Sequence, residues 1–300
     1  MEMLGLFQTV LDTDQIKIQE AMAKHTTFRV GGPAEVLITP RMDQLAAVLQ
    51  LCREHCLPVL VIGNGSNMLV SDEGISGVVI EIGRSMSEIT VNGSRITAQA
   101  GALLSKVAAA ATEHCLTGIE FASGIPGSIG GALFMNAGAY GGEMKDVVVS
   151  ARVMTSEGEI CDLSLEELDL SYRHSVVSEK GYIVLDVTLG LENGDPAEIQ
   201  NRIDELTEKR TTKQPLEFPS AGSTFKRPEG YFAGKLIQDS GLRGHSCGGA
   251  QVSEKHCGFV INKENATASD VYRLIKEVQA VVKEKFGVSL ETEVKMIGKF

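Results

Sequence analysis

The glycine-rich stretch between residues 122 and 143 constrains this chain more than any other part of its sequence. Its 22 residues, ASGIPGSIGGALFMNAGAYGGE, include seven glycines. Glycine costs backbone entropy on folding, so this density favours positive φ angles or a backbone that approaches another group closely. A second glycine-rich turn, GNGSN (63–67), directly follows an apolar run at 58–62. A strand that enters a turn with free N–H groups forms an anion-binding nest, so the two segments predict a large phosphate-bearing cofactor held by main chain.

The composition of the 300-residue chain limits the ligands and the location that suit it. Its length predicts about two or three domains. A formal net charge of −11 disfavours a general nucleic-acid or anionic membrane surface, so local Arg, Lys and N–H groups must hold any anionic ligand. The first residues lack a secretory signal, and no apolar stretch of about 18 residues predicts a membrane span. Six scattered cysteines without CxxC or zinc-site spacing predict a cytoplasmic chain with reduced thiols and no metal.

Helices are predicted in four parts of the chain. Two of them cover residues 43–56 and 102–114. A third contains Ile199, Ile203 and Leu206 and is expected to fray over 210–215, which marks a domain boundary. The fourth runs from Thr267 to Gly287, because Thr267 with Asp270 is typical of a helix start and glycine is typical of a helix end.

Strands outnumber helices in the middle of the chain. Alternating or apolar runs bounded by turn residues predict strands at 59–62, 77–82 and 182–192, hairpins over 88–101 and 147–163, and a last strand over 288–297. The hairpins turn at Asn92-Gly93 and Glu157-Gly158. The strands do not alternate regularly with helices, and neither glycine segment gives GxGxxG between a strand and a helix. This pattern disfavours a Rossmann domain.

Three further clusters contain residues able to perform chemistry. SYRHS (171–175) precedes a strand, AGSTFKRP (221–228) places hydroxyls beside cations, and alternation in the last strand puts Glu291 and Glu293 on one face. Each cluster also has an ordinary interpretation, since Arg173 suits a solvated surface, Ser223 suits a turn or helix cap, and both glutamates suit a solvated strand face. The residues alone leave these alternatives open.

The order of the motifs resembles one family. HTTFRVGGPAE (25–35), GNGSN, GIPGSIGGALFMNAGAYG (124–141), SYRHS, AGSTFKRP, GKLIQDSGLRG (234–244) and LETEV (290–294) follow one another along the chain. In this order they resemble the UDP-N-acetylenolpyruvoylglucosamine reductases, flavoenzymes of bacterial peptidoglycan synthesis, over essentially the whole chain from His25. The resemblance implies an α+β fold with two FAD-binding subdomains of the vanillyl-alcohol-oxidase-like (PCMH-type) class, at 1–77 and 78–210. It also implies a C-terminal α+β substrate domain at 211–300, with the last strand packing back on the active site.

The resemblance also implies a reaction. Hydride passes from NADPH to non-covalent FAD and then to the vinyl carbon of UDP-N-acetylglucosamine enolpyruvate, which gives UDP-N-acetylmuramate. Negative charge develops at the adjacent carbon and on the substrate carboxylate, so the site needs a cation, an acid and a proton donor. The resemblance assigns Arg173 and Glu293 to the carboxylate and assigns Ser223 to protonation of the adjacent carbon.

Contacts with the two ligands follow from the same resemblance. The residues expected to contact FAD are Gly63, Asn64, Gly65, Ser66, Asn67, Met68, Ser123, Gly124, Ile125, Pro126, Gly127, Gly130, Gly131, Ala132, Asn136, Gly138, Tyr140 and Arg210. Those expected to contact the nucleotide-sugar are Tyr172, Lys213, Arg227 and His256. Many relatives have Asn where this chain has Arg227.

Two other functions fit part of the sequence. One is an FAD-dependent oxidase of the same fold that acts on a small alcohol or sugar, and the other is a non-enzymatic regulator that binds flavin or a nucleotide-sugar. The joint presence of SYRHS, AGS and LETEV disfavours both. We expect a cytoplasmic monomer that binds neither nucleic acid nor membrane.

Overall fold

Two structural units, each assembled from separate chain segments, make up the protein. The computed structural model describes residues 2–300. Unit 1 comprises the residues up to Lys17, Val36–Asn64 and Gly77–Lys209, and unit 2 comprises Ile18–Glu35, Gly65–Ser76 and Arg210–Phe300. Strands β1 (Ile16–Ala21), β2 (Pro33–Ile38) and β5 (Ile75–Glu81) span the divisions between these segments. The predicted three-domain division stays a prediction.

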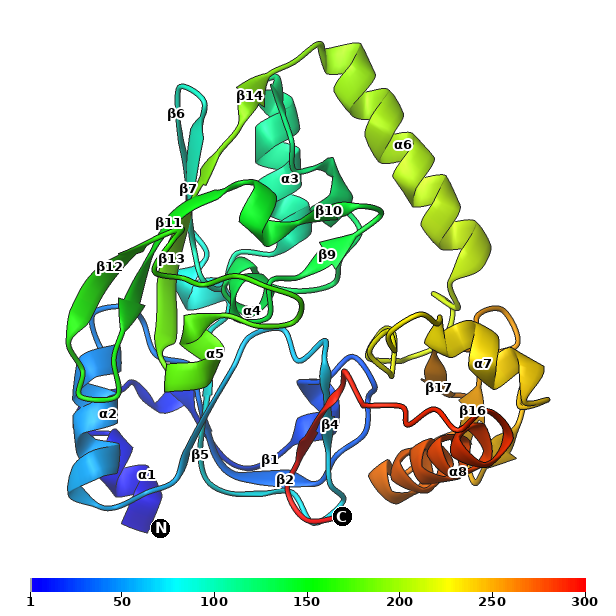
Figure 1. Cartoon of the computed structure of the whole chain (residues 1–300). Coiled ribbons are helices and arrows are strands. Elements are labelled where there is room, and N and C mark those ends of the chain that lie inside the picture. The colour runs from blue at the N-terminus through cyan, green and yellow to red at the C-terminus, as the bar shows by residue number, and fades with distance from the viewer. Residues whose placement is uncertain (1) are drawn as a thin grey trace. The chain divides into compact units, whose positions relative to one another are not determined.

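An antiparallel five-stranded sheet forms the centre of unit 1 (Figure 1). Its strands, in spatial order, are β12 (Ile160–Ser164), β11 (Val148–Met154), β13 (Ile183–Gly190), β7 (Arg95–Gln99) and β6 (Ile89–Asn92). Helices α3 (Leu104–Glu113) and α4 (Ile129–Phe134) pack against β6, β7 and β13. Apolar residues from these elements share one core, which explains why β13 alternates between buried and half-buried positions.

Both predicted hairpins are confirmed. In the β6–β7 hairpin, Asn92 pairs with Arg95, and Gly93 in the loop has φ +59°. In the β11–β12 hairpin, Met154 pairs with Ile160, and Gly158 has φ +89°. Glycine adopts these left-handed angles without the steric cost that a Cβ adds.

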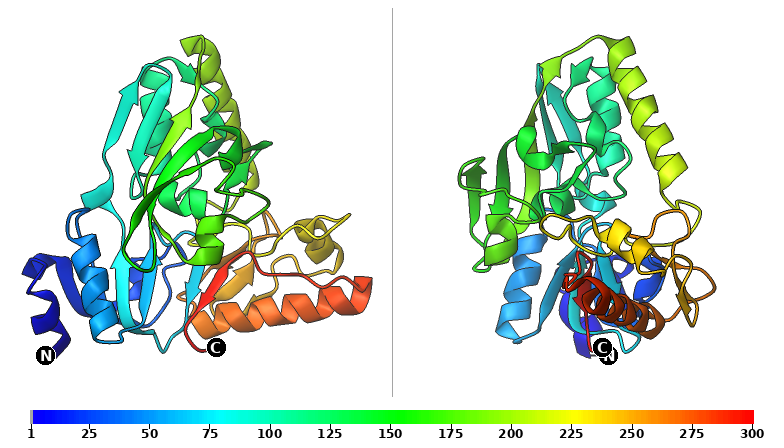
Figure 2. Two further views of the ribbon diagram at one scale, coloured as in Figure 1. Left: turned by 60° about the vertical axis from the view of Figure 1, so that its left-hand side comes forward. Right: turned by 45° about the vertical axis from the view of Figure 1, so that its right-hand side comes forward.

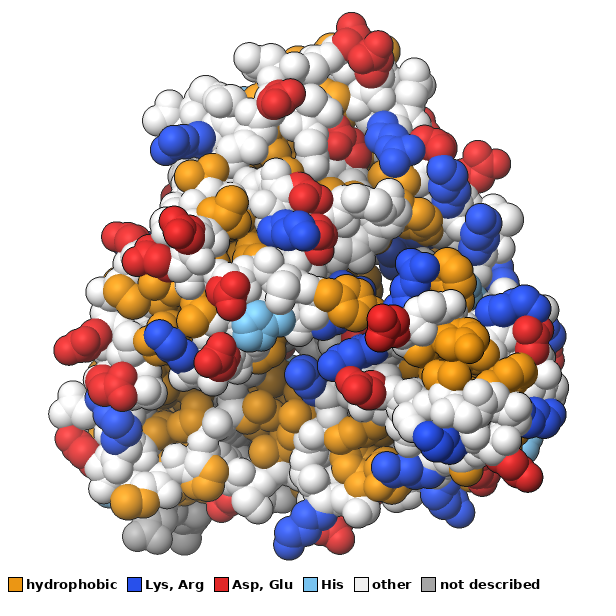
Figure 3. All heavy atoms as spheres, in the orientation of Figure 1, with side chains coloured by type: hydrophobic (Ala, Val, Ile, Leu, Met, Phe, Trp, Pro, Cys, Tyr) orange, Lys and Arg blue, Asp and Glu red, His pale blue; other side chains and the backbone are white. Residues whose placement is uncertain are grey.

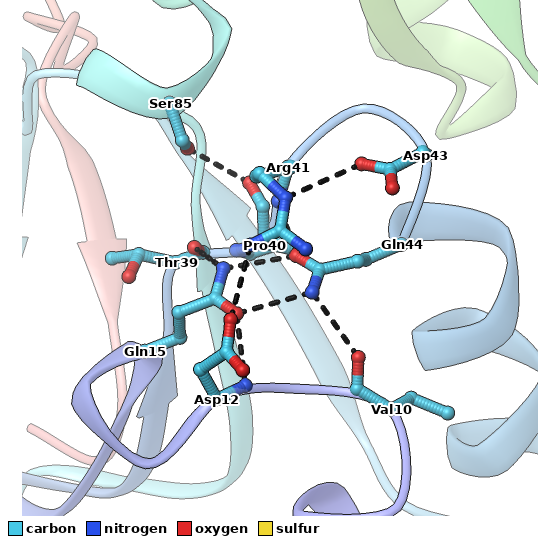
Figure 4. A network of polar contacts seen from close by, with 9 residues as sticks. All are labelled: Val10, Asp12, Gln15, Thr39, Pro40, Arg41, Asp43, Gln44 and Ser85. Carbon is cyan, nitrogen blue, oxygen red and sulfur yellow. Dashed lines mark hydrogen bonds and ion pairs between the residues drawn. The ribbon is translucent and has the colours of Figure 1, made fainter.

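A buried pair of glutamines ties the N-terminal segment of unit 1 to helix α2 (Leu45–Glu54) (Figure 4). Gln15 Nε2 donates to Thr39 O at 2.9 Å and to Gln44 Oε1 at 2.9 Å. Gln44 Nε2 donates to Val10 O at 3.2 Å. Because these amides satisfy one another and the main chain, the polar groups are buried without an unpaired donor.

Shorter elements complete unit 1. Near its start are α1 (Glu2–Phe7), the 3₁₀ turns η1 (Thr13–Gln15) and η3 (Arg84–Met86), and strand β3 (Val59–Ile62), which pairs in parallel with β5. The remaining elements are β8 (Leu116–Thr117), η4 (Glu120–Ala122), β9 (Gly138–Ala139), β10 (Gly142–Glu143), η5 (Met144–Asp146), α5 (Val176–Lys180) and β14 (Glu192–Asn193).

Unit 2 is built around a three-stranded sheet and one long helix. The sheet has the order β15 (Ser246–Cys247), β16 (Ala250–Val252) and β17 (Val260–Asn262), and α8 (Ala268–Phe286) packs on it (Figure 2). Its other elements are η2 (Met22–Lys24), β4 (Met68–Val70), α7 (Ala233–Asp239) and β18 (Lys295–Ile297).

The predicted ends of α8 are confirmed. Thr267 Oγ1 accepts from Asp270 N, and Asp270 Oδ2 accepts from Thr267 N, each at 3.0 Å. Gly287 ends the helix with φ +70°. Asp72 adds a second cap, since its carboxylate accepts from the N–H groups of Ala268 at 2.7 Å and Ser269 at 2.9 Å.

The predicted fraying of the helix before residue 215 is wrong. Helix α6 (Pro196–Lys213) continues through Arg210 to Lys213. Glu205 pairs with both Arg202 and Lys209 one turn away, which supports a polar helix. Pro215 then explains the end, because proline disfavours helical geometry at the residue before it.

The predicted last strand over 288–297 is also wrong in its extent. Only Lys295–Ile297 form a strand, β18, which pairs in parallel with β4. Upstream, Thr292 makes an isolated bridge to Phe225. The chain changes partner between these points, so a continuous strand is interrupted, although Leu290 and Val294 are buried as the alternation predicts.

Two surface properties bear on the expected ligands. On the face shown in Figure 3, acidic and basic side chains are intermixed. Among residues 2–300, no helix combines the length and the apolar character needed to cross a membrane.

Candidate functional site

The two glycine-rich segments meet in unit 1. Asn64 Nδ2 donates to Pro126 O at 2.6 Å. A Cβ on Gly63 would lie 2.3 Å from Ser128 Oγ, so any other residue here would force the Ser128 hydroxyl to move. The structure therefore brings together the segments that the sequence predicts to hold one cofactor.

The turn after β3 has unused main-chain donors. Gly65 has φ +59°, and its carbonyl accepts from Thr27 N at 3.2 Å. Among the described residues, none accepts a hydrogen bond from the N–H groups of Gly63, Asn64, Gly65 or Ser66. Unpaired N–H groups are costly where they are buried, as at Gly65, and a phosphate oxygen is a suitable acceptor for them. These residues therefore fit the anionic part of a dinucleotide cofactor.

Packing within the protein accounts for some of the other glycines. A Cβ on Gly130 would lie 2.7 Å from Ala100 Cβ, and a Cβ on Gly138 would lie 2.7 Å from Gly142 O. These two positions let α4 and the β9–β10 hairpin approach neighbouring backbone. Direct contact between them and a cofactor stays a prediction.

The turn between β9 and β10 has an unusual conformation for its sequence. Ala139 pairs with Gly142, and the two loop residues Tyr140 and Gly141 have φ of +54° and +92°, as in a type I′ turn. An aromatic residue rarely adopts this geometry, which costs about 1–3 kcal/mol where it is strained. The Tyr140 ring is partly exposed, so the turn presents it to a ligand or to solvent.

Arg173 also has a left-handed backbone. Ser171 and His174 exchange two main-chain hydrogen bonds, and Arg173 sits between them with φ +57°. Its guanidinium carbon lies 5.0 Å from the centre of the exposed Tyr172 ring. The turn therefore presents a cation and a phenol from one short loop of unit 1.

Ser223 lies on a segment of unit 2 that is fixed on both sides. On one side Thr224 N donates to Gly258 O at 2.8 Å, and Thr224 Oγ1 accepts from Val260 N at 3.0 Å. On the other side Glu293 N donates to Thr224 O at 2.9 Å. Thr224 is buried, whereas the Ser223 side chain is exposed. The serine hydroxyl is thus presented from a rigid main chain that does not depend on it.

Glu293 and Glu291 lie in different environments. The Glu293 main chain is held by Thr224 on one side and by Asn67 on the other, since Asn67 Nδ2 donates to Glu293 O at 3.2 Å. Glu293 is half-buried, while the Glu291 side chain is 75% exposed and pairs with Lys226 Nζ at 3.2 Å. Of the two glutamates, only Glu293 makes a main-chain hydrogen bond to the Ser223–Thr224 segment.

His256 is a half-buried neutral histidine of unit 2. Burial lowers the pKa of its imidazole. Nδ1 accepts from Gly258 N at 3.1 Å, so the proton of the neutral ring is on Nε2. His256 is therefore able to donate one hydrogen bond to a ligand without carrying a charge.

The predicted basic contacts are on unit 2. Arg210 and Lys213 are in the last turn of α6. The Arg227 guanidinium lies 4.0 Å from the centre of the exposed Phe232 ring, a cation–π contact that the sequence analysis did not identify. The structure groups Ser223, Glu293 and His256 within unit 2, and Arg173 with Tyr172 within unit 1. A joint role for the two groups stays a prediction.

Comparison with known proteins identifies the class and then the family. Residues 33–164 match the family model of an FAD binding domain, and residues 214–297 match that of the C-terminal domain of UDP-N-acetylenolpyruvoylglucosamine reductase. The fold and these matches define an oxidoreductase that uses FAD. Reductases of this name from Clostridium perfringens and Clostridioides difficile are similar over nearly their full lengths. The Clostridium perfringens protein is 57% identical over 100% of this chain and 98% of its own length. The Clostridioides difficile protein is 55% identical over 97% of this chain and 96% of its own length. The chain therefore belongs to the UDP-N-acetylenolpyruvoylglucosamine reductase family.

A solved structure agrees with this assignment. The UDP-N-acetylenolpyruvylglucosamine reductase of Thermus caldophilus is 35% identical, with a TM-score of 0.82 over 94% of this chain and 100% of that one. The predicted family, the α+β fold with an FAD-binding module and a C-terminal domain, and the FAD cofactor are confirmed.

Proposed function

We propose that this chain reduces UDP-N-acetylglucosamine enolpyruvate to UDP-N-acetylmuramate with NADPH as the reductant. When bound, FAD would serve as the hydride carrier between NADPH and the vinyl carbon. The names of the curated relatives and the FAD-binding match support this reaction class. The reaction belongs to the cytoplasmic stage of peptidoglycan precursor synthesis, and the chain acts as a monomer.

The observation that carries the proposal is the main-chain hydrogen bond that joins Glu293 to Thr224, the neighbour of Ser223. The Glu293 N–H bond to Thr224 O places an acidic side chain and an exposed hydroxyl on two neighbouring, hydrogen-bonded segments. Reduction of an enolpyruvyl ether needs one proton at the carbon next to the new C–H bond and charge stabilisation at the carboxylate. Ser223 delivers the proton, and Glu293 with Arg173 stabilises the carboxylate as charge develops.

The remaining predicted contacts then hold the substrate in place. Tyr172, Lys213, Arg227 and His256 bind the nucleotide-sugar, and Lys213 and Arg227 offset its diphosphate charge. His256 donates through Nε2, as its tautomer requires.

Ser223→Ala tests the proposal, because it removes the hydroxyl and leaves the Thr224 hydrogen bonds in place. NADPH should reduce the flavin at the wild-type rate, while reoxidation by the enolpyruvyl substrate should slow by about 10²–10⁴-fold. Stopped-flow absorbance measures both half-reactions. Ser220→Ala is the matched control on the same segment and should leave both rates unchanged. Equal slowing of both half-reactions by Ser223→Ala would contradict the assignment.

Substrate-dependent NADPH oxidation separates this function from the two alternatives. The proposed reductase consumes one NADPH for each enolpyruvyl substrate. An oxidase of the same fold would instead reduce oxygen with an alcohol or sugar as the donor. A binding protein would bind flavin or nucleotide-sugar with no turnover.

A further inference from the structure

A fully buried asparagine connects the Arg173 turn to the end of α4. The Asn136 side chain is 0% exposed. Its Nδ2 donates to Ser171 O at 3.1 Å and to Glu143 Oε2 at 2.8 Å, and its Oδ1 accepts from Lys145 N at 2.9 Å. Both N–H donors of the amide are thus used within unit 1.

A fully buried serine makes a second connection at the other end of the same turn. Ser175 is 0% exposed, and its Oγ donates to Phe134 O at 2.7 Å. The same hydroxyl accepts from Ser178 N at 3.1 Å and so caps α5. Residues 171 and 175, which flank the Arg173 turn, are therefore both fixed to the C-terminal end of α4.

We propose that Asn136 and Ser175 are positioning residues that hold the Arg173 turn in place for the substrate carboxylate. This inference rests on the proposed function, in which Arg173 binds that carboxylate. Helix α4 belongs to the glycine-rich segment of the FAD-binding match, so the two contacts also connect the cation to the cofactor-binding segment. The sequence predicted that Asn136 contacts FAD, but its side chain is fully buried and makes its hydrogen bonds within unit 1, so Asn136 acts through Ser171.

The backbone of Arg173 explains why the turn needs two fixed ends. A non-glycine residue at φ +57° is less stable than in the ordinary regions, and such strain persists only where the surroundings impose it. Without its fixed ends the turn relaxes toward a lower-energy conformation and displaces the guanidinium. A displacement of about 1 Å in a catalytic group costs about 10²-fold in rate.

Of the three hydrogen bonds of the Asn136 side chain, an amide–carboxylate exchange removes the one to Ser171 O, and it also removes the Glu143–Lys145 ion pair. In the double variant Asn136→Asp with Glu143→Gln, the amide introduced at position 143 donates to the carboxylate introduced at position 136. That carboxylate still accepts from Lys145 N, while Ser171 O loses the Asn136 donor and keeps only the bond from His174 N within its own turn. The single variant Glu143→Gln is the matched control, because it removes the same carboxylate from position 143 and keeps Asn136 with its bond to Ser171 O.

Ser175→Ala tests the second contact independently if the exchange variant fails to fold. It removes the hydroxyl that reaches Phe134 O and also weakens the α5 cap. Ser178→Ala is its control, since it removes the partner side chain of that cap and keeps the contact to Phe134 O.

The assay compares the two half-reactions, flavin content and thermal stability of each variant. Reoxidation by the enolpyruvyl substrate should slow about 10-fold or more in the exchange variant and in Ser175→Ala. Flavin reduction by NADPH and flavin content should stay at wild-type values. Both controls should behave as wild type.

A double-mutant cycle with Arg173→Ala separates a positioning role from a structural one. If Asn136 and Ser175 act through Arg173, their variants should slow reoxidation less than about twofold further once Arg173 is alanine. A full additional loss in that background, or equal slowing of both half-reactions, would overturn the inference and leave the proposed function intact. If Arg173→Ala itself leaves reoxidation unchanged, the proposed role of Arg173 fails and the inference fails with it.

Discussion

Exchanging each of two nearby glutamates for glutamine tests which carboxylate serves the reaction. Glu291 and Glu293 are two residues apart, and simple strand alternation does not distinguish them. The structure does, because Glu291 pairs with Lys226 at the surface, whereas the main chain of half-buried Glu293 is bonded to Thr224 and Asn67. Glutamine has the same shape in both places, so the comparison isolates the acidic group.

The expected losses differ by orders of magnitude. An exposed ion pair such as Glu291–Lys226 contributes about 0–1 kcal/mol, so Glu291→Gln should change the rate by at most about fivefold. An acidic group that acts in the transition state contributes about 10²–10⁴-fold, or about 3–5 kcal/mol. Glu293→Gln should therefore slow flavin reoxidation by at least about a hundredfold.

Stopped-flow measurement with the enolpyruvyl substrate gives both rates. Each variant is first reduced with NADPH, which should proceed as in the wild type, and is then mixed with substrate. Nearly equal losses in the two variants would refute the reasoning, as would a larger loss for Glu291→Gln. Slow reduction by NADPH in either variant would instead reveal damage to the cofactor site.

Two further substitutions test other parts of the structure. Gly65→Ala should abolish flavin retention, measured as flavin absorbance per protein, because the added Cβ would lie 1.9 Å from His25 O. Gly93→Ala is the control and should retain flavin, because Gly93 has the same φ of +59° and open space around it. Asp72→Asn should lower the free energy of unfolding by about 0.5–2 kcal/mol at pH 7, seen as a lower thermal midpoint, because Asp72 uses both carboxylate oxygens and its charge to cap α8, and an amide has one acceptor oxygen and no charge. Burial raises the pKa of Asp72, but hydrogen bonds from Ser269 and Ala268 outweigh it and hold the pKa below 3.8. This stabilisation is complete above pH 3.8 and is lost as the pH falls through the lower folded value, so the difference between wild type and variant should shrink there. A difference that grows on acidification would contradict this account.

Local signals predicted much of the fold correctly. Thr267, Asp270 and Gly287 define α8 because capping and helix ends depend on residues within one turn. The Asn92-Gly93 hairpin is local for the same reason, although its loop residues are Gly93 and Ser94. Shared chemistry alone predicted that the two glycine-rich segments hold one cofactor. The Asn64–Pro126 hydrogen bond brings the segments together, and their joint contact with the cofactor stays a prediction.

Features that depend on distant partners were not predictable from the sequence. The last strand is short because residues 292 and 295–297 pair with different segments, and alternation does not indicate a change of partner. The left-handed backbone of Arg173 runs against the preference of its residue type, and contacts 35 and 41 residues apart fix its turn. The link from Asn136 to Ser171 spans 35 residues and has no local signature.

The hydrogen bond between Asn67 and Glu293 joins residues 226 positions apart. During translation the ribosome adds Glu293 long after both glycine-rich segments have been made. Contacts between residues so far apart form slowly, because the chain loses the entropy of closing the loop before the contact can stabilise it. A chain shortened before residue 291 would keep the whole FAD-binding match at 33–164 and lack Glu293, the proposed acid. Flavin content therefore reports on an early-synthesised part of this molecule, and enolpyruvyl turnover reports on a part completed much later.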